Sequence, residues 1–357
     1  MVRVGIIGCG NIARSAHIPA YMARHDVTCS HFCDIRPERA QDMVARYGTG
    51  KATVAYREVL ADPEVDAVSI CTPNHLHAAI AIEAMRAGKD VLCEKPAART
   101  LDEVLAMRRT RRETGRVLNI GVVNRFNGAV RKIRDLIAEN ALGQVYHVYV
   151  SFRARRSIPG LGGDFTNRSV AGGGVLIDWG VHFLDLVMFC CGDPMPVTVS
   201  GKAYCMLGRN IGEYVYNSMW AGPPDPAGVC DVEDCISGFI RTEGPTVSLN
   251  GAWAQNIGTD EMFVDFLGDR AGIRLQYGKG FTLYGARDGR LFDDSSIHYG
   301  NPPMFDEEIE DFVHSIRTRS KSVADLDTVL RSAAIIQALY DSSDRGQEVR
   351  FEEYDAL

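Results

Sequence analysis

The sequence predicts a two-domain protein of α/β plus α+β class, with a doubly wound parallel sheet first and a large open, mostly antiparallel sheet second. Three observations predict this class. The chain has 357 residues, more than one domain usually contains. Its first third alternates short β-branched runs with helical patterns, as parallel sheets with crossover helices do. After Arg125 long alternating segments replace that pattern. We therefore expect domains over residues 1–124 and 125–357.

The first domain is expected to contain five strands joined by helices. Apolar, β-branched runs predict strands over residues 2–7, 27–33, 65–71, 90–93 and 117–122. Helical periodicity predicts helices over residues 11–24, 37–47, 75–87 and 101–114, with Pro19 interrupting the first. Pro37 suits a first helical turn, and Gly88 and Gly115 suit helix ends. The right-handed crossover rule favours a doubly wound sheet over a set of hairpins.

The second domain is expected to begin with a helix over residues 128–139 and to continue mainly as strands. Strand patterns cover residues 146–155, 197–207, 235–242, 247–254 and 262–268, and most of them are expected in one open antiparallel sheet. Two amphipathic helices follow, over residues 303–317 and 326–342. Either domain can receive these last helices, so the terminal helix is a candidate to pack back on the first domain.

Composition and charge exclude several classes of protein. Hydrophobic residues make up 46% of the chain and charged residues 24%, so a sizeable buried core is expected and disorder is not. Thirty-nine Lys and Arg against 46 Asp and Glu give a net charge of -7, which argues against nucleic acid as a partner. No apolar run approaches the roughly 20 residues of a membrane span, so we expect no membrane association.

The ten cysteines predict a reduced, cytoplasmic protein rather than a disulfide framework. The chain opens directly with a strand-like run instead of a signal peptide, and several cysteines lie inside apolar runs. Cys230 and Cys235, with acidic residues between them, are the one place where a metal site can be argued. Their spacing is wide and no second ligand pair accompanies them, so we expect no metal.

The strongest local motif is Gly8-Cys9-Gly10-Asn11-Ile12-Ala13, which directly follows a predicted strand and opens a helix. In this context the first glycine permits a tight turn, the second lets the backbone approach a pyrophosphate, and Ala13 lets helix and strand pack closely. A glycine-rich turn without a ligand is the alternative. Asp34, 24 residues past Gly10, is placed to accept hydrogen bonds from an adenosine ribose, which favours NAD. Arg36 keeps NADP open as the second choice.

Two later segments carry residues suited to chemistry. Glu94-Lys95-Pro96 follows a short strand, at the edge where doubly wound sheets bind ligands, and the proline holds Lys95 in an extended or turn conformation. Asp178 and His182 are four residues apart in an apolar segment after three glycines, so a helix there places both on one face. They form either a satisfied buried pair or a site. Surface decoration is the alternative for Lys95.

These motifs resemble the Gfo/Idh/MocA family, named for glucose-fructose oxidoreductase, inositol dehydrogenase and rhizopine catabolism. The matching residues, in order, are the glycine motif, Thr72-Pro73-Asn74 with His77, Glu94-Lys95-Pro96, Arg125-Phe126, and Gly172-Gly173-Gly174 with Asp178-x-Gly180-x-His182. The match covers essentially the whole chain, and Glu-Lys-Pro combined with the Asp and His is specific to the family. The resemblance implies an N-terminal Rossmann domain, a C-terminal open sheet, NAD or NADP, and hydride transfer at a carbinol carbon of a sugar, glycoside or inositol. It also implies a homo-oligomer, a dimer or tetramer, formed through the open sheet.

The resemblance also implies roles for single residues. Lys95 is similar to the lysine that hydrogen-bonds the reacting hydroxyl, His182 to the general base, and Asp178 to a residue that binds a neighbouring hydroxyl or orients the other two. An imidazole titrates near neutral pH and suits a general base, and an ammonium group stabilises a developing alkoxide. The expected cofactor-binding residues are Gly8, Gly10, Asn11, Ile12, Asp34, Arg36, Thr72, Asn74, His77, Glu94 and Lys95. The expected substrate-binding residues are Lys95, Arg125, Arg153, Arg155, Asp178, Trp179 and His182.

The identity of the substrate is the most open part of the prediction. The stretch from Arg153 through Arg155 and Arg156 resembles a branch that handles pyranosides, some of its members oxidising ring carbon three. An edge strand protected by charge is the alternative. Trp179 and Trp253 suit either stacking on a sugar ring or the core. Besides a dehydrogenase, two functions stay open: a redox-neutral enzyme that oxidises a ring carbon transiently, and a non-catalytic dinucleotide sensor.

Overall fold

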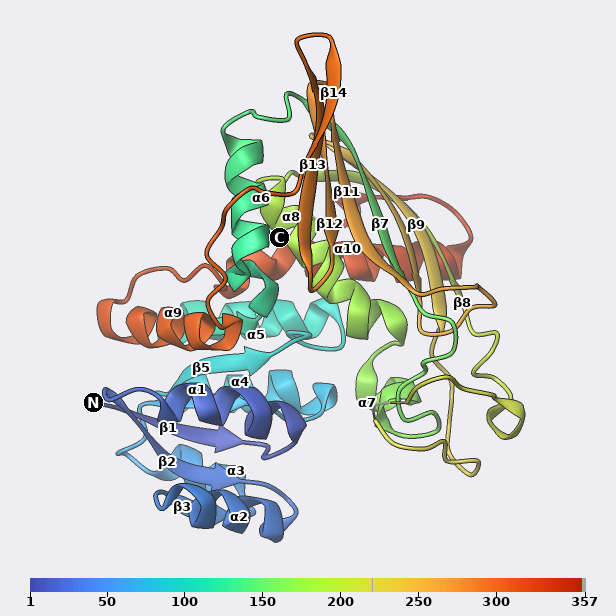
Figure 1. Ribbon diagram of the computed structural model, residues 1–357. Coiled ribbons are helices and arrows are strands. Elements are labelled where there is room, and N and C mark those ends of the chain that lie inside the picture. Colours follow the sequence, from blue (N-terminus) through green and yellow to red (C-terminus); the bar gives the residue numbers. More distant parts are fainter. Residues whose placement is uncertain (220, 355–357) are drawn as a thin grey trace. The chain divides into compact units, whose positions relative to one another are not determined.

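The computed structural model describes residues 1–219 and 221–354 and divides the chain into two compact units (Figure 1). Unit 1 comprises Met1–Phe126 and Pro302–Val329, and unit 2 comprises Asn127–Asn301 and Leu330–Leu357. The division lies two residues beyond the expected boundary after residue 124. In addition, a segment near the C-terminal end, which we assigned to the second domain, belongs to unit 1.

Unit 1 is built on a six-stranded sheet in the order β3-β2-β1-β4-β5-β6, and every pair is parallel. This order reverses direction at β1, as in a Rossmann fold, and confirms the predicted doubly wound sheet. The strands are β1 (Val2–Ile7), β2 (Val27–Cys33), β3 (Lys51–Thr53), β4 (Ala67–Ile70), β5 (Asp90–Glu94) and β6 (Leu118–Gly121). Sequence patterns missed β3, because its three residues are largely exposed and carry no apolar run.

The helices of unit 1 follow the expected alternation with its strands. They are η1 (Ala13–His17), α1 (Ile18–Met22), α2 (Pro37–Tyr47), α3 (Tyr56–Ala61), η2 (Asn74–Leu76), α4 (His77–Arg86), α5 (Leu101–Thr114) and η3 (Val123–Phe126). Two of them begin or end as predicted: Pro37 occupies the first turn of α2, and Gly115 ends α5 with a φ of 65°. The short helix α3 was not predicted.

The first helix contains a feature that Pro19 explains. A proline inside a helix removes a backbone hydrogen bond, and the chain accommodates it with a π-helical turn, η1, directly before α1. The expected interruption therefore takes the form of a wider turn rather than a break. This turn carries His17, which is fully buried.

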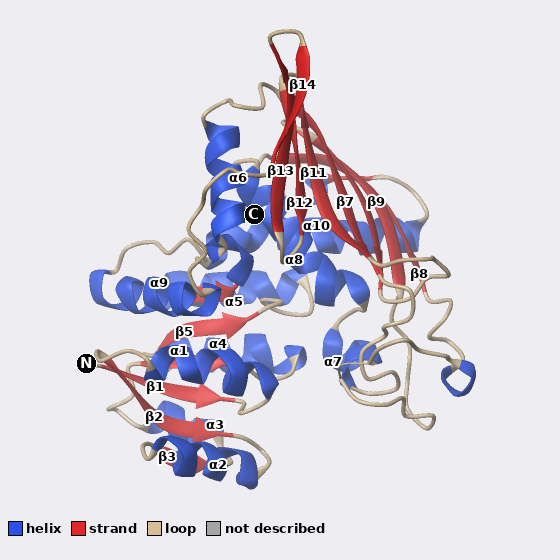
Figure 2. Cartoon of the chain, in the orientation of Figure 1, coloured by secondary structure: helices blue, strands red, loops and turns tan. Residues whose placement is uncertain are grey.

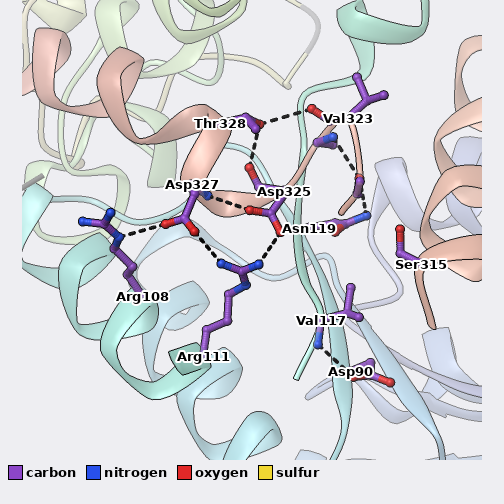
Figure 3. A network of polar contacts seen from close by, with 12 residues as sticks. Asp90, Arg108, Arg111, Val117, Asn119, Ser315, Val323, Asp325, Asp327 and Thr328 are labelled. Carbon is purple, nitrogen blue, oxygen red and sulfur yellow. Dashed lines mark hydrogen bonds and ion pairs between the residues drawn. The ribbon is translucent and has the colours of Figure 1, made fainter. Parts of the chain in front are cut away.

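The C-terminal segment of unit 1 consists of α9 (Met304–Thr318) and the first residues of α10 (Leu326–Arg345). Polar contacts attach it to α5, as Figure 3 shows. Asp327 accepts hydrogen bonds from Arg108 at 2.8 Å and Arg111 at 2.7 Å, and Arg111 also pairs with Asp325 at 2.5 Å (Figure 3). In the nearby core Asn119 donates to Ser322. These contacts join residues about 200 positions apart, which explains why the boundary was not visible in the sequence.

Unit 2 is built on a nine-stranded sheet in the order β14-β13-β12-β11-β7-β10-β9-β8-β15 (Figure 2). All pairs are antiparallel except β7 with β10, so the predicted mostly antiparallel sheet is confirmed. The strands are β7 (Val145–Arg153), β8 (Pro196–Tyr204), β9 (Cys235–Thr242), β10 (Thr246–Ala252), β11 (Glu261–Gly268), β12 (Ala271–Gln276), β13 (Gly280–Arg287), β14 (Arg290–Asp294) and β15 (Val349–Arg350). Sequence patterns did not find the last four.

Among the helices of unit 2, α8 (Val181–Cys190) and α10 pack against its sheet. The helices of this unit are α6 (Gly128–Ala138), η4 (Asp164–Thr166), α7 (Arg168–Ala171), η5 (Leu176–Gly180), α8, η6 (Ile211–Glu213) and η7 (Phe351–Tyr354), together with the larger part of α10. Phe183 of α8 stacks on Phe152 of β7, with ring centroids 4.9 Å apart. Leu339 of α10 lies against Gly201 and Gly238, where no side chain keeps the helix away.

One helical stretch of the described residues, Arg168–Cys190, is long and apolar enough to cross a membrane by length and composition. Our expectation that no segment reaches this length and hydropathy is therefore wrong. Of its most apolar window, 78% is buried inside the protein, as in core helices. The stretch contains α7, η5 and α8, and its apolar side chains form part of the unit 2 core.

Candidate active site

The glycine motif forms a tight turn between β1 and η1. Gly8 has a φ of 93°, and a Cβ on it would lie 2.5 Å from the carbonyl oxygen of Cys71, so only glycine fits. At Gly10 a Cβ would meet nothing within 4 Å, which leaves open space above the backbone. Asn11 and Ile12 begin the helix, and Ala13 is fully buried against the strand. This geometry fits a pyrophosphate at a helix N-terminus.

Asp34 stabilises the glycine turn at the end of β2. Its carboxylate accepts hydrogen bonds from the backbone N–H of Cys9 at 2.9 Å and of Arg36 at 2.9 Å. A carboxylate has about four lone-pair positions, so Asp34 keeps capacity for ribose hydroxyls. Arg36 is exposed, whereas Arg39, which the sequence did not single out, lies 3.8 Å from the Asp34 carboxylate. Arg39 is the third residue of α2 and lies in its first turn, and spacing alone does not connect it to Asp34.

The Glu94 carboxylate holds the backbone of Lys95 through a buried polar network. One oxygen of Glu94 accepts a hydrogen bond from the Lys95 N–H at 3.0 Å, and the other lies 2.7 Å from Nε2 of His17. Nδ1 of His17 lies 2.9 Å from the Ser69 hydroxyl on β4. The π-helical turn η1 therefore brings His17 to the residue that precedes Lys95. His17 was not predicted from the sequence, where its one signal is a polar residue in an apolar helix shortly before a proline.

His17 and Glu94 carry opposite charges inside unit 1. Burial lowers the pKa of His17, but its contacts with Cys71 and Glu94 outweigh that and raise the pKa well above its usual value. Burial raises the pKa of Glu94, but the hydrogen bond and charge of His17 hold it below its usual value. Both pKa directions favour an imidazolium paired with a carboxylate. Buried charges are stable only when paired in this way.

His77 joins the Thr72 loop to the turn after Lys95. Its Nε2 lies 2.8 Å from the carbonyl oxygen of Thr72, and its Nδ1 lies 2.8 Å from that of Pro96. Burial lowers the pKa of His77, which is 1% exposed. Both ring nitrogens thus contact protein carbonyls, which favours a role in holding the two loops. The Thr72 hydroxyl oxygen, in contrast, is buried without a hydrogen-bond partner among the described residues, as expected of a group awaiting a ligand.

Asp178 lies in the π-helical turn η5, which continues directly as α8. Its carboxylate is 9% exposed and accepts a hydrogen bond from the indole Nε1–H of Trp253 at 3.2 Å. His182 follows about one helical turn later and is half-buried. π-Helical turns occur frequently at functional sites. Trp253 is therefore a partner of Asp178, a role that we did not predict when we considered it for stacking or core packing.

Along the run of three glycines before Asp178, other segments of unit 2 approach the backbone closely. A Cβ on Gly174 would lie 1.9 Å from the Glu233 carbonyl oxygen, and one on Gly173 would lie 2.1 Å from the Tyr340 hydroxyl. The Glu233 carboxylate accepts hydrogen bonds from the N–H groups of Gly174 and Leu176, each at 3.0 Å. It also accepts one from Tyr340 at 2.8 Å. Glu233 therefore caps the start of the Asp178 helix, and nothing in the sequence connected these distant residues.

The predicted substrate-binding residues beyond the catalytic trio differ in their surroundings. Arg125 is 3% exposed and donates to Val323, just before α10, and to Thr328 in the first turn of α10, which favours a structural role; its contact with substrate stays a prediction. Arg153 pairs with Glu261 at 2.5 Å. Arg155 is exposed, and Trp179 is half-buried.

The predicted catalytic residues belong to both units. Lys95 lies in unit 1 with the glycine turn, Asp34, Thr72 and Glu94. Asp178 and His182 lie in unit 2. Asn74, in the same loop as Thr72, is half-buried at the start of η2. Unit 1 thus holds the residues predicted to bind the dinucleotide, and unit 2 holds two of the three predicted catalytic residues.

Two family models match the chain. Residues 2–122 match the oxidoreductase family with an NAD-binding Rossmann fold, and residues 130–274 match the GFO/IDH/MocA C-terminal domain. D-Glucoside 3-dehydrogenase of Escherichia coli is 30% identical over 352 residues, covering 98% of this chain and 97% of that protein. Levoglucosan dehydrogenase of Pseudarthrobacter phenanthrenivorans is 32% identical over 263 residues, covering 67% of this chain and 64% of that protein.

Solved structures share the fold over nearly the whole chain. Levoglucosan dehydrogenase in complex with NADH and levoglucosan gives a TM-score of 0.82 at 22% identity, covering 98% of this chain and 99% of that one. Aldose-aldose oxidoreductase of Caulobacter crescentus gives 0.81 at 23% identity, with the same coverage. The family models span most of the chain and the E. coli relative spans it almost completely. The chain therefore belongs to the Gfo/Idh/MocA family of NAD-binding oxidoreductases.

Proposed function

We propose that this enzyme oxidises a secondary alcohol of a glycoside with NAD, at ring carbon three, with Lys95 and His182 acting on the same hydroxyl. The observation that supports the substrate class best is the match to D-glucoside 3-dehydrogenase over 98% of this chain and 97% of that protein. The open space above Gly10 and the unpartnered Thr72 hydroxyl support cofactor binding in unit 1. When bound, NAD supplies the hydride acceptor.

The proposed roles follow from the proton that an alcohol must lose as it becomes a ketone. His182 accepts this proton at its imidazole, because imidazole is basic enough near neutral pH. The ammonium group of Lys95 donates a hydrogen bond to the same oxygen and stabilises its negative charge. The Asp178 carboxylate, fixed by Trp253, accepts a hydrogen bond from a neighbouring sugar hydroxyl.

We further propose that His17 and His77 are positioning residues for Lys95. His17 acts through Glu94, whose carboxylate receives the Lys95 N–H, and His77 acts through the carbonyl oxygen of Pro96. Lys95 is thus anchored on both sides through its backbone. Such anchoring matters because a catalytic group must be held within a fraction of an ångström.

Oligomer formation through the open sheet and a cytoplasmic location stay proposals. On the sheet face opposite the buried core, half-buried Tyr149 and Phe263 contact each other with ring centroids 5.8 Å apart, beside the ion pair of Arg274 with Asp265, which supports a contact surface of mixed apolar and charged side chains there. All ten cysteines are free, which agrees with a reducing compartment. Sedimentation analysis of wild type and Tyr149→Glu tests the first proposal: a wild-type monomer contradicts it. The absence of nucleic-acid and membrane partners stays a prediction.

A stereochemically varied panel of hexoses, glucosides and inositols, assayed with NAD and with NADP, tests the function. The expected result is NADH absorbance with glucosides and a ketone at carbon three by NMR. Turnover without net NADH would favour the redox-neutral alternative. NAD binding with no oxidation of any member of the panel, and no loss of biological function in Lys95→Ala, would favour the sensor.

A further inference from the structure

Unit 2 contains a pocket of about 550 Å³ that none of the predicted roles explains fully. Three segments line it: the chain just after β7, the loop before residue 218, and the chain after β10. The lining residues are Arg155, Arg156, Val215, Tyr216, Asn217, Asn256 and Ile257. Its volume lies within the range of small-molecule sites.

The guanidinium groups of the two arginines of this pocket have no carboxylate partner among the described residues. The backbone N–H of Arg155 donates to Asp260, but neither guanidinium forms an ion pair within the part of the chain that the structure describes. Arg153, two residues earlier, does pair with Glu261. Two guanidinium groups beside one pocket without a compensating carboxylate attract an anion, and their planar geometry suits carboxylate and phosphate oxygens.

The pocket is also built to hold Arg156 in place. Its guanidinium donates to the Asn256 side chain at 2.5 Å and lies 5.8 Å from the centroid of the Tyr214 ring. Its carbonyl oxygen accepts hydrogen bonds from the N–H groups of Asn217 and Ser218, at 2.9 and 3.3 Å. The backbone thus ties the 217–218 loop to the chain after β7. A fixed guanidinium loses little entropy when it binds a ligand.

The pocket adjoins the part of unit 2 that carries Asp178. Strands β7 and β10 are parallel neighbours, so their carboxyl ends reach the same edge of the sheet. After β10 comes Trp253, which donates to Asp178 and whose carbonyl accepts the N–H of Ser157. Arg156 forms a β-bridge with Ala254, the next residue. The segments after β7 and after β10 therefore form part of the pocket wall, and the second of them also carries Trp253, the hydrogen-bond partner of Asp178.

We propose that this pocket binds an anionic substituent of the sugar substrate, a carboxylate or phosphate group carried outside the oxidised ring. This inference rests on the proposed function and narrows its substrate class to anionic glycosides and sugar phosphates. Asn217 and Asn256 offer amide groups for hydroxyls beside the anion. Val215, Tyr216 and Ile257 provide an apolar side for an aglycone.

A matched pair of substrates tests the proposal. The kcat/KM for 4-carboxyphenyl glucoside is compared with that for phenyl glucoside, and glucose 1-phosphate supplies the phosphate arm. We expect wild type to prefer the anionic substrate by about 10-fold or more, and the preference to fall with rising salt. In the double variant Arg155→Gln/Arg156→Gln the preference should disappear, mainly through KM. Arg155→Lys/Arg156→Lys should keep part of it, and Arg290→Gln, at an exposed arginine of β14, should keep all of it.

Direct binding separates failure of this inference from failure of the proposed function. Calorimetric titration of glucose 1-phosphate and of 4-carboxyphenyl glucoside into the NAD complex requires no turnover. Weaker binding in Arg155→Gln/Arg156→Gln than in wild type supports the pocket even if neither compound is oxidised. Equal affinity in both proteins, or a wild type that does not distinguish the anionic from the neutral glucoside, overturns it. A midpoint of thermal unfolding equal to that of wild type shows that the variants are folded.

Discussion

The two units support their candidate catalytic residues with different kinds of contact. In unit 1 the backbone of Lys95 is held by Glu94, which forms a buried charged pair with His17. In unit 2 the Asp178 carboxylate accepts a hydrogen bond from a neutral indole, and Glu233 fixes the start of its helix where glycines allow a close approach. The position of Lys95 therefore depends on a buried charged pair, whereas the position of Asp178 depends on an indole hydrogen bond and on close backbone packing.

The largest expected effect comes from unit 2. His182→Ala should lower kcat by roughly two to four powers of ten, because the alcohol loses its general base. NAD affinity, which depends on unit 1, should stay within about threefold by fluorescence titration. His298→Ala, at an exposed histidine of the same unit, serves as the control. Wild-type turnover in His182→Ala would remove this residue from the mechanism.

The charge dependence of unit 1 gives the next largest effect. His17→Leu leaves the buried Glu94 carboxylate unpaired and should lower kcat by about 10- to 100-fold through displacement of Lys95. His17→Gln, whose amide can donate to Glu94, should recover much of that loss, while His25→Gln at an exposed histidine should change nothing. The acid limb of the kcat pH profile should shift in His17→Gln. If the Leu and Gln variants are equally slow, with an unshifted profile, His17 is only a packing residue.

A further effect concerns the stability of unit 1, which is measured as a free energy of unfolding rather than as a rate. Glu308 on α9 is fully buried, its two carboxylate oxygens have no hydrogen-bond partner among the described residues, and burial raises its pKa to about 8. The folded state therefore keeps this proton while the unfolded state loses it near pH 4.5, so stability falls as pH rises from about 4.5 to about 8. Glu308→Gln should remove this fall. Relative to wild type, the free energy of unfolding of this variant should be higher by up to about 4 kcal/mol at pH 8 and nearly unchanged at pH 4.5.

Denaturant unfolding at the two pH values measures this difference. Glu113→Gln, at an exposed glutamate of α5, is the matched control and should change stability equally little at both. A pH-independent effect of Glu308→Gln would show that Glu308 is ionised in the folded protein.

The smallest effect concerns the choice of cofactor. Asp34→Ser removes a carboxylate that would repel a 2′-phosphate, so the ratio of kcat/KM for NADP to that for NAD should rise by about 10-fold. Arg39 lies 3.8 Å from the Asp34 carboxylate and the backbone N–H of Arg36 donates to it, so both arginines are near enough to supply positive charge for that phosphate. Asp42→Ser, at an exposed aspartate of α2, is the control. An unchanged ratio in Asp34→Ser contradicts the role assigned to Asp34.

The fold class and the motif residues were predicted from the sequence better than the residues that hold the motif residues in place. Strands such as β2 and β9 were found at their bounds because apolar periodicity over seven or eight residues determines them. The strands β12 to β14 were missed, because their half-exposed residues depend on neighbouring strands. His17, Glu233 and Trp253 reach the motifs through tertiary contacts between residues 57 to 77 positions apart, and no local pattern encodes such contacts.

The triple glycine shows how a correct signal received an incomplete interpretation. We took the run as a sign of close backbone approach, and the structure shows that the approaching groups are Glu233 and Tyr340 of the protein itself. Likewise Arg125, part of the family motif, is committed to Val323 and Thr328. Motif residues can therefore also serve the architecture of a site.

The central claim is that Lys95 and His182 act on one hydroxyl, and a double-mutant cycle tests it most directly. Single-turnover rates of hydride transfer are measured for wild type, Lys95→Ala, His182→Ala and the double variant at saturating substrate and NAD. Groups that act as a unit are strongly non-additive, so the double variant should be about as slow as the slower single variant. Losses that multiply in the double variant would show two independent roles and contradict the account.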